Sequence, residues 1–193
     1  MKAILALGLA TLLLAACGLN RPAVERQSFV LAPLRATAAA PATGPSVKLG
    51  GVEVAPPFDG RGFVYRREGQ RFESDFYNEF AAAPAELLGQ ATATWLRRSG
   101  LFAAVIESRL AGGADLRIDT AVSALYVDFT DEGPAAVLAV RWRITEEGRA
   151  TREVSRDERV PLQARTPAGA AQAIQEALAR ALAGLEAALA GGR

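Results

Sequence analysis

The order of hydrophobic and polar residues predicts strands through much of the chain. Alternation is clearest in residues 138–144, where the apolar positions are Leu138, Val140, Trp142 and Ile144. A period of two is that of a strand with one buried face. The same pattern begins at Leu116 and changes phase at Leu125, which predicts a bulge or a segment covered on both faces. We expect these two strands to pair antiparallel through the turn between them.

Shorter strands are expected where β-branched, aromatic and other apolar residues gather. These segments are residues 27–31, 47–54, 63–65 and 103–107, and Gly50-Gly51 predicts a bulge in the second of them. Residues 149–160 carry charges on both faces, which is typical of a strand at the edge of a sheet. A functional alternative is that these charges form a strip for a partner together with Arg141 and Arg143.

Two helices are predicted where the apolar period lengthens to that of a helix. The first begins at Pro84 and ends at Gly100, and its apolar side consists of Leu87, Leu88, Ala91, Trp95 and Leu96. The second begins with Thr166 as a cap and Pro167 in the first turn. Its apolar stripe is Ile174, Leu178, Leu182, Leu185 and Leu189, which favours packing on a sheet over a second membrane anchor.

The predicted fold class is therefore α/β (α+β), with one mixed, largely antiparallel sheet packed against two amphipathic helices. Three connections are expected between its elements. Asp59-Gly60 has the residue types that tolerate positive φ in a turn. Residues 75–80 are expected to form a loop before the first helix. Residues 35–46, rich in Ala, Pro and Thr, are expected to form a flexible loop.

The N-terminus has the form of an export signal. Its apolar stretch is shorter than the roughly 20 residues that a helix needs to cross a bilayer. It ends in Leu14-Ala15-Ala16-Cys17, which matches a bacterial lipobox. We expect residues 1–16 to be removed, Cys17 to carry acyl chains such as palmitate, residues 17–26 to be a tether and residues 27–193 to be one domain. An ordinary secretory signal is the alternative.

Composition narrows the chemistry. The chain has no His, so the commonest general base and the commonest zinc ligand are both lacking. Cys17 is the sole cysteine, which excludes an intramolecular disulfide. The net charge of +1 argues against nucleic acid as a partner. No helix start follows Gly50-Gly51, so no phosphate loop is predicted, and no cofactor or metal is expected.

Three stretches together resemble the ABC-type transport auxiliary lipoprotein family. They are PPFDGRGFVYR, PAELLGQATATWLRRSGLF and ALYVDFTDEGPAAVLAVRWRI. That family accompanies MCE-type lipid transporters in bacteria with two membranes. The resemblance implies a non-catalytic subunit that docks an MCE-domain protein and its ABC permease and ATPase at the periplasmic face of the outer membrane. Gly18 after the lipobox agrees with outer-membrane sorting, and a ring-shaped homo-oligomer would suit a ring-forming partner.

Aromatic and Arg residues dominate interface energies, which makes several side chains candidate partner contacts. They are Phe58, Arg61, Tyr65, Arg66, Phe76, Tyr77 and Phe80, and each of them could equally belong to the core. Three alternatives stay open. An envelope hydrolase would use Asp75 and Glu79 as acid and base. A calcium site would use Asp128, Asp131 and Glu132, although a solvated turn is the preferred interpretation of these acids. A purely structural lipoprotein would have no transport role.

Overall fold

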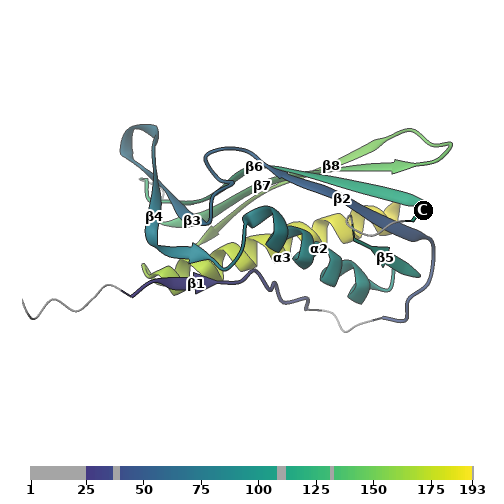
Figure 1. Cartoon of the computed structure of the whole chain (residues 1–193), viewed down its shortest axis with the longest axis horizontal. Coiled ribbons are helices and arrows are strands. Elements are labelled where there is room, and N and C mark those ends of the chain that lie inside the picture. The colour runs from purple at the N-terminus through teal and green to yellow at the C-terminus, as the bar shows by residue number, and fades with distance from the viewer. Residues whose placement is uncertain (1–24, 37–39, 108–111, 131–132, 193) are drawn as a thin grey trace, which may run out of the picture.

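The computed structural model describes residues 25–36, 40–107, 112–130 and 133–192, and Cys17 lies outside them. Within these residues the chain forms one eight-stranded sheet and two α-helices (Figure 1). The elements are β1 (Gln27–Phe29), β2 (Ser46–Val54), β3 (Gly62–Arg67), the 3₁₀ turn η1 (Glu68–Gln70), β4 (Arg71–Phe80), α2 (Pro84–Ser99), β5 (Ala104–Ile106), β6 (Leu116–Asp128), β7 (Ala135–Glu146), β8 (Arg152–Pro161) and α3 (Pro167–Gly191). The predicted α+β class is confirmed.

Strand β6 is the centre of the sheet. It pairs antiparallel with β7 along its whole length, and β7 pairs antiparallel with β8. Its other edge is shared, because β2 runs parallel to its first half and β3 runs parallel to its last two residues. β4 and then β1 extend the sheet beyond β3, and β5 lies beyond β2. The mixed and largely antiparallel sheet of the prediction is confirmed.

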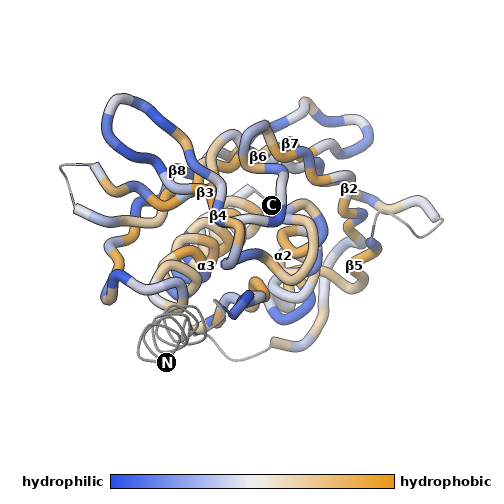
Figure 2. Tube along the Cα trace, turned by 60° about the vertical axis from the view of Figure 1, so that its left-hand side comes forward, coloured by the Kyte–Doolittle hydropathy of each residue, from blue (hydrophilic) through white to orange (hydrophobic). Residues whose placement is uncertain are grey.

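Both helices cover the same face of the sheet (Figure 1). α2 packs on β2 and β5, and α3 packs on β7 and β8. The core lies between these layers, and its largest fully buried side chains include Trp142, Phe63, Leu96 and Ile118. The five leucine and isoleucine positions of the α3 stripe are all buried, so their prediction as core residues is confirmed. Figure 2 shows hydrophobic residues along both helices, whereas the projecting turns are hydrophilic.

Glycines mark the places where the sheet departs from regular pairing. The register shifts between Leu49 and Val52, which confirms the bulge predicted at Gly50-Gly51. A Cβ at Gly50 would meet the Asp119 carboxylate, so the Asp119 side chain occupies the space that this glycine leaves open. The phase change in β6 also has its predicted cause, a register shift between Val122 and Ala124 that returns the apolar side to the core.

The starts of both helices and the end of α2 are as predicted. Pro84 is in the first turn of α2, and Gly100 ends this helix in the left-handed conformation with φ of 74°. Thr166 caps α3 by accepting a hydrogen bond from the main-chain nitrogen of Gly169 at 3.1 Å. None of the helices among the described residues is long and apolar enough to cross a membrane.

Asp59 and Gly60 lie in the predicted turn region between β2 and β3, but the prediction for residues 75–80 is wrong. Residues 75–80 are not a loop but the second half of β4, which forms a hairpin with β3. Positive φ falls at Gly69 and Gln70 in the turn of this hairpin, and Asp59 and Gly60 have none. The sequence Glu-Gly-Gln lacks the Asn-Gly or Asp-Gly signature of a tight hairpin, so the sequence did not reveal the turn between β3 and β4.

The segment after β1 crosses the helix layer before the chain enters β2. β1 joins the sheet beside β4, so residues 30–45 connect two strands of one sheet. Part of the predicted loop lies against the C-terminal end of α2. There the main-chain nitrogens of Ala40 and Thr43 donate hydrogen bonds to the carbonyls of Arg98 and Gly100, at 3.2 and 3.1 Å respectively. This contact depends on Gly100, because a side chain there would lie 2.6 Å from the Ala40 Cβ.

Candidate docking surface on the β3–β4 hairpin

Asp75 organises a wide bulge in β4. Ser74 pairs with Val64 and Glu79 pairs with Gly62, so β4 has extra residues between these two pairs. Within the bulge, Asp75 Oδ1 accepts hydrogen bonds from the main-chain nitrogens of Tyr77 and Asn78 at 2.8 and 3.1 Å. Burial alone would raise the pKa of Asp75, but the hydrogen bonds that it accepts outweigh this effect and hold the pKa below its usual value.

The second oxygen of Asp75 ties the bulge to the neighbouring strand. Oδ2 accepts from Asn78 Nδ2 and from the Tyr65 hydroxyl, both at 2.8 Å. Burial and this donated hydrogen bond raise the pKa of Tyr65 far above its usual value, so its hydroxyl stays protonated. Gly62 lies opposite, where a Cβ would come within 2.5 Å of the Asp75 carbonyl oxygen. The close approach therefore requires glycine at position 62.

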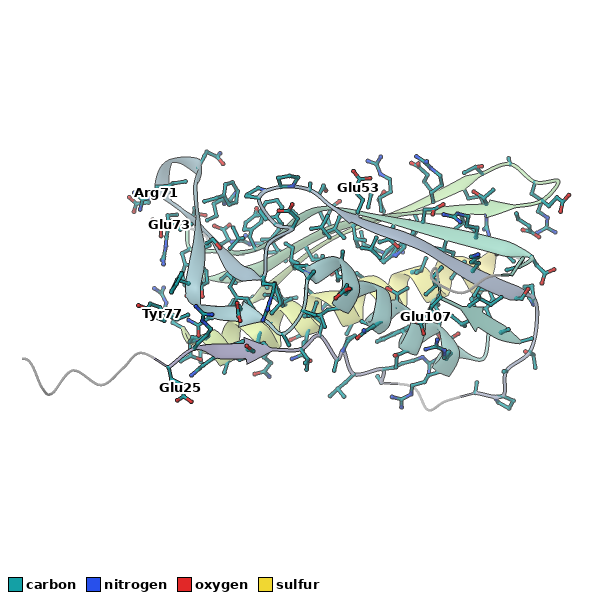
Figure 3. The ribbon with its side chains drawn as sticks, in the orientation of Figure 1. Glu25, Glu53, Arg71, Glu73, Tyr77 and Glu107 are labelled. Atoms are coloured by element: carbon teal, nitrogen blue, oxygen red, sulfur yellow. The ribbon has the colours of Figure 1, made fainter. Side chains whose placement is uncertain are left out.

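The bulge turns two aromatic side chains into solvent. Phe76 is 71% exposed and Tyr77 is 43% exposed. Their rings meet edge to face with centroids 5.4 Å apart, and the Arg26 guanidinium lies 5.1 Å from the Phe76 centroid. Figure 3 shows Arg71, Glu73 and Tyr77 following one another along β4 at the end of the molecule near Glu25.

Arg61 completes this exposed group. Its Nε donates to the Phe80 carbonyl at 3.0 Å, and its Nη2 donates to Glu79 Oε1 at 2.8 Å, while half of the side chain stays exposed. We call Arg61, Phe76 and Tyr77 the hairpin surface. An exposed surface of aromatic rings and an oriented guanidinium is of the kind that provides most of the binding energy in protein interfaces.

Asp128 fixes the base of the hairpin to the sheet. Its carboxylate is fully buried and accepts from Arg66 Nε and Nη2 at 3.1 and 2.5 Å, and from Arg159 Nη1 at 2.6 Å. Thr130 adds a main-chain and a hydroxyl hydrogen bond. Burial favours the neutral acid, but the hydrogen bonds from both arginines and from Thr130 prevail and lower the pKa of Asp128 well below its usual range.

The structure separates the predicted contact residues into three groups. Phe76 and Tyr77 are exposed side by side, and Arg61 is exposed where it binds Glu79 of the same strand. Tyr65 and Arg66 are partly buried and are used by Asp75 and Asp128 within the protein. Phe58 and Phe80 were predicted as contacts but are buried, because Phe58 stacks on Tyr126 at 5.5 Å and Phe80 lies 4.8 Å from the Phe63 ring.

The alternatives from the sequence meet different outcomes. Asp75 and Glu79, the acid and base of the hydrolase alternative, lie in strand β4 and bind Tyr65 and Arg61 respectively. Asp128, predicted at a solvated turn, is instead buried with arginines, while residues 131 and 132 of the calcium alternative lie outside the described residues. No group of three or more potential metal ligands occurs in the part of the chain that the structure describes.

The charges of β8 lie beside Arg141 and Arg143 on the uncovered face of the sheet. Glu153 of β8 lies 3.9 and 3.5 Å from Arg141 and Arg143 of β7. These residues, with Glu53 and Asp119, line an open depression of about 340 Å³. Figure 3 shows Glu53 on the side of the sheet away from the helices. The charges are exposed and of both signs, which is typical of a solvated face.

The sequence did not reveal the part that Asp128 and Arg159 play. The two arginines that bind Asp128 lie 62 positions before it and 31 positions after it. The periods of helices and strands relate only residues that are close in sequence, so they do not connect Asp128 with these arginines. The only signal was an acidic residue at the end of a strand whose apolar alternation stops there.

The protein is an α+β domain with both helices on one face of an open sheet and with two exposed aromatic side chains on the β3–β4 hairpin. The model of the ABC-type transport auxiliary lipoprotein component matches residues 29–185. The chain therefore belongs to this family. No curated protein matches the sequence.

Solved structures agree with the fold. A crystal structure of an uncharacterized protein is similar with a TM-score of 0.70 and 16% identity, and the match covers 85% of this chain and 99% of that one. Protein XCC0632 from Xanthomonas campestris, of family DUF330, is similar with a TM-score of 0.69 and 17% identity, over 86% of this chain and 97% of that one. Identities this low show a shared fold alone.

Proposed function

We propose that this protein is the anchored auxiliary subunit of an MCE-type ABC transport system and docks the periplasmic assembly at the outer membrane for lipid transport between the membranes. The proposal includes removal of residues 1–16, acylation of Cys17 and a tether of residues 17–26. Two or more acyl chains give stable membrane attachment, whereas one chain gives only reversible binding. The function is binding, and catalysis is left to the ATPase of the system.

The hairpin surface is the observation that carries this proposal. Phe76 and Tyr77 are exposed, yet the four hydrogen bonds accepted by Asp75 hold their backbone in one conformation. A preorganised surface loses little conformational entropy on binding, so more of its contact energy appears as affinity. The MCE-domain protein is proposed as its partner on the strength of the family, which assists ABC-type transport.

The test is co-purification of the acylated protein with its MCE partner after solubilisation in mild detergent. Phe76→Ala with Tyr77→Ala should lower the amount of bound partner at least tenfold, since hot-spot aromatics contribute about 2 kcal/mol or more each. The matched control is Arg141→Ala with Arg143→Ala, which removes exposed side chains from the charged strip. This control should bind normally.

Several results would contradict the proposal. Unchanged binding by the aromatic variant, with loss in the arginine variant, would move the interface to the uncovered sheet face. Absence of any MCE partner for the unaltered protein would favour a purely structural lipoprotein.

Both double variants should unfold at the temperature of the unaltered protein, because exposed substitutions change stability by about 0.5 kcal/mol or less.

Anchoring is tested separately. The mature protein should carry acyl mass on its first residue, Cys17. Cys17→Ser should abolish membrane fractionation while the circular dichroism spectrum of the domain is unchanged. Persistence of this variant in the membrane fraction would show that the attachment does not depend on the thiol.

A further inference from the structure

Apolar side chains are exposed immediately after β1. Leu34 is 87% exposed and Val30 is 57% exposed. Among the described residues, the other large hydrophobic side chains with high exposure are Phe72, Phe76 and Tyr77, all on β4. Residues 30–34 therefore form a second apolar surface, separate from the hairpin surface and next to the point where the described chain begins.

This second surface borders a groove on the helix layer. Residues 30–35 form one wall, and the other side is lined by α2 residues both apolar and polar: Leu87, Gln90, Ala91, Thr94 and Trp95. The groove has a volume of about 380 Å³ and is lined mainly by apolar atoms, with Arg98 at its rim. We call residues 30–35 and this groove the tether-side patch. Figure 1 shows the segment running from β1 along the helix layer, on the side opposite to the uncovered face of the sheet.

The exposed position of Val30 and Leu34 is fixed by the residues around them. The Ala32 nitrogen donates to Gln175 Oε1 of α3 at 3.2 Å. Arg35 Nε and Nη2 donate to the two oxygens of Glu186 at 3.0 and 2.7 Å, and Trp95 Nε1 donates to the same carboxylate at 2.8 Å. The segment is thus attached at two points, and the apolar side chains between them are presented outward.

We propose that the tether-side patch lies on the bilayer surface and that Val30 and Leu34 enter its interfacial region. This inference rests on the proposed anchoring at Cys17. The chain between Cys17 and Glu25, extended at 3.3–3.6 Å per residue, spans at most about 29 Å. The acyl chains therefore keep this end of the domain within that distance of the membrane, where apolar side chains and a nearby cation such as Arg98 suit a surface of anionic lipids.

A lipid surface fits the patch better than a second protein chain does. Stable protein interfaces bury about 800 Å² on each partner, with a well-packed centre. Two isolated side chains beside a shallow groove offer much less. Interfacial insertion needs only a few apolar side chains once covalent acyl chains keep the protein at the surface, because the tether has already supplied the main part of the attachment.

The absence of other thiols allows a direct test. Cys17 is the only cysteine and its sulfur is used in acylation, so Leu34→Cys or Val30→Cys introduces one free thiol. Ser155→Cys is the control, since Ser155 is exposed on β8 and pairs with Arg141 on the face away from α3. Each acylated full-length variant is labelled with an environment-sensitive fluorophore and reconstituted into phosphatidylethanolamine–phosphatidylglycerol vesicles.

The fluorophore at position 34 or 30 should show a blue-shifted emission, a several-fold lower quenching by iodide than at position 155, and strong quenching by lipids with a spin label on the acyl chain. Equal iodide quenching at the three positions would overturn the proposal. Protection from iodide without quenching by the labelled lipids would also overturn it, because a second protein copy would then cover the patch. Lack of acyl mass on Cys17 would instead remove the anchoring on which the inference rests.

Discussion

Asp128→Asn tests whether the buried carboxylate holds the hairpin to the sheet. Asparagine has nearly the same shape, but it removes the negative charge and places an amide donor against the donors of Arg66 and Arg159. Removing one partner of a buried ion pair costs about 3–5 kcal/mol, because the remaining charge is left uncompensated. Both arginine side chains are partly exposed, so water compensates some of that charge. We therefore expect a loss near 3 kcal/mol.

A loss of this size is large compared with the total stability of a domain, about 5–15 kcal/mol. At about 2–4 °C per kcal/mol for a chain of this length, the unfolding temperature should fall by about 6–12 °C. The assay is thermal and urea denaturation followed by circular dichroism at pH 7. Hydrogen exchange should also rise in β3 and β4, which lose the ion pair between Arg66 and β6, more than in α3.

Asp119→Asn is the matched control. Asp119 is on the same strand and binds Arg117 at 2.6 Å, but both side chains are exposed to solvent. Exposed ion pairs contribute about 0–1 kcal/mol, so this variant should unfold within a few degrees of the unaltered protein. If Asp128→Asn lowered the unfolding temperature no more than Asp119→Asn does, the argument that burial makes the Asp128 ion pairs important for stability would be refuted.

Three further predictions use the same measurements. The folded-state pKa of Asp128 is lowered, so its contribution to stability is present above the unfolded pKa of about 3.9 and is lost as the pH falls below that value. The stability of Asp128→Asn should therefore decline less steeply in acid than that of the unaltered protein. Gly62→Ala should cost about 1–3 kcal/mol through the clash with the β4 main chain, whereas Gly60→Ala, with open space around it, should be nearly neutral. Glu186→Gln should cost about 1.5–3 kcal/mol by weakening the hydrogen bonds from Arg35, with faster hydrogen exchange in residues 30–35, and unchanged exchange there would contradict this role.

The regular parts of the fold were predictable because each has a local signal. Alternation located β6 and β7, a phase change located the bulge at Val122, and a proline and a glycine bounded α2. The hairpin of β3 and β4 was missed in its second half because bulges break the period of two, and polar residues in a bulge look like a loop. The sequence also did not show which aromatic side chains are buried. Phe80 and Tyr77 looked alike in sequence, but Phe80 is buried and Tyr77 is exposed.

The three carboxylates that sequence reasoning did not place share one physical role. Asp75 fixes a bulge, Asp128 fixes the base of a hairpin and Glu186 fixes the segment after β1. Each binds donors from at least two parts of the chain, and the pKa of each is lowered. Irregular segments lack the repeated hydrogen bonds of helices and sheets, so a multiply bonded carboxylate is an effective way to hold them in one conformation.

This role connects the stability of the domain with both proposed surfaces. The hairpin surface depends on Asp75, and the tether-side patch depends on Glu186, so each exposed apolar group is presented by a segment that a buried or partly buried acid restrains. Neither segment has to become ordered on contact, which favours binding through preformed shape. It follows that weakening either acid should lower binding at its own surface before it unfolds the domain, and that the two losses should be independent because the clusters share no residue.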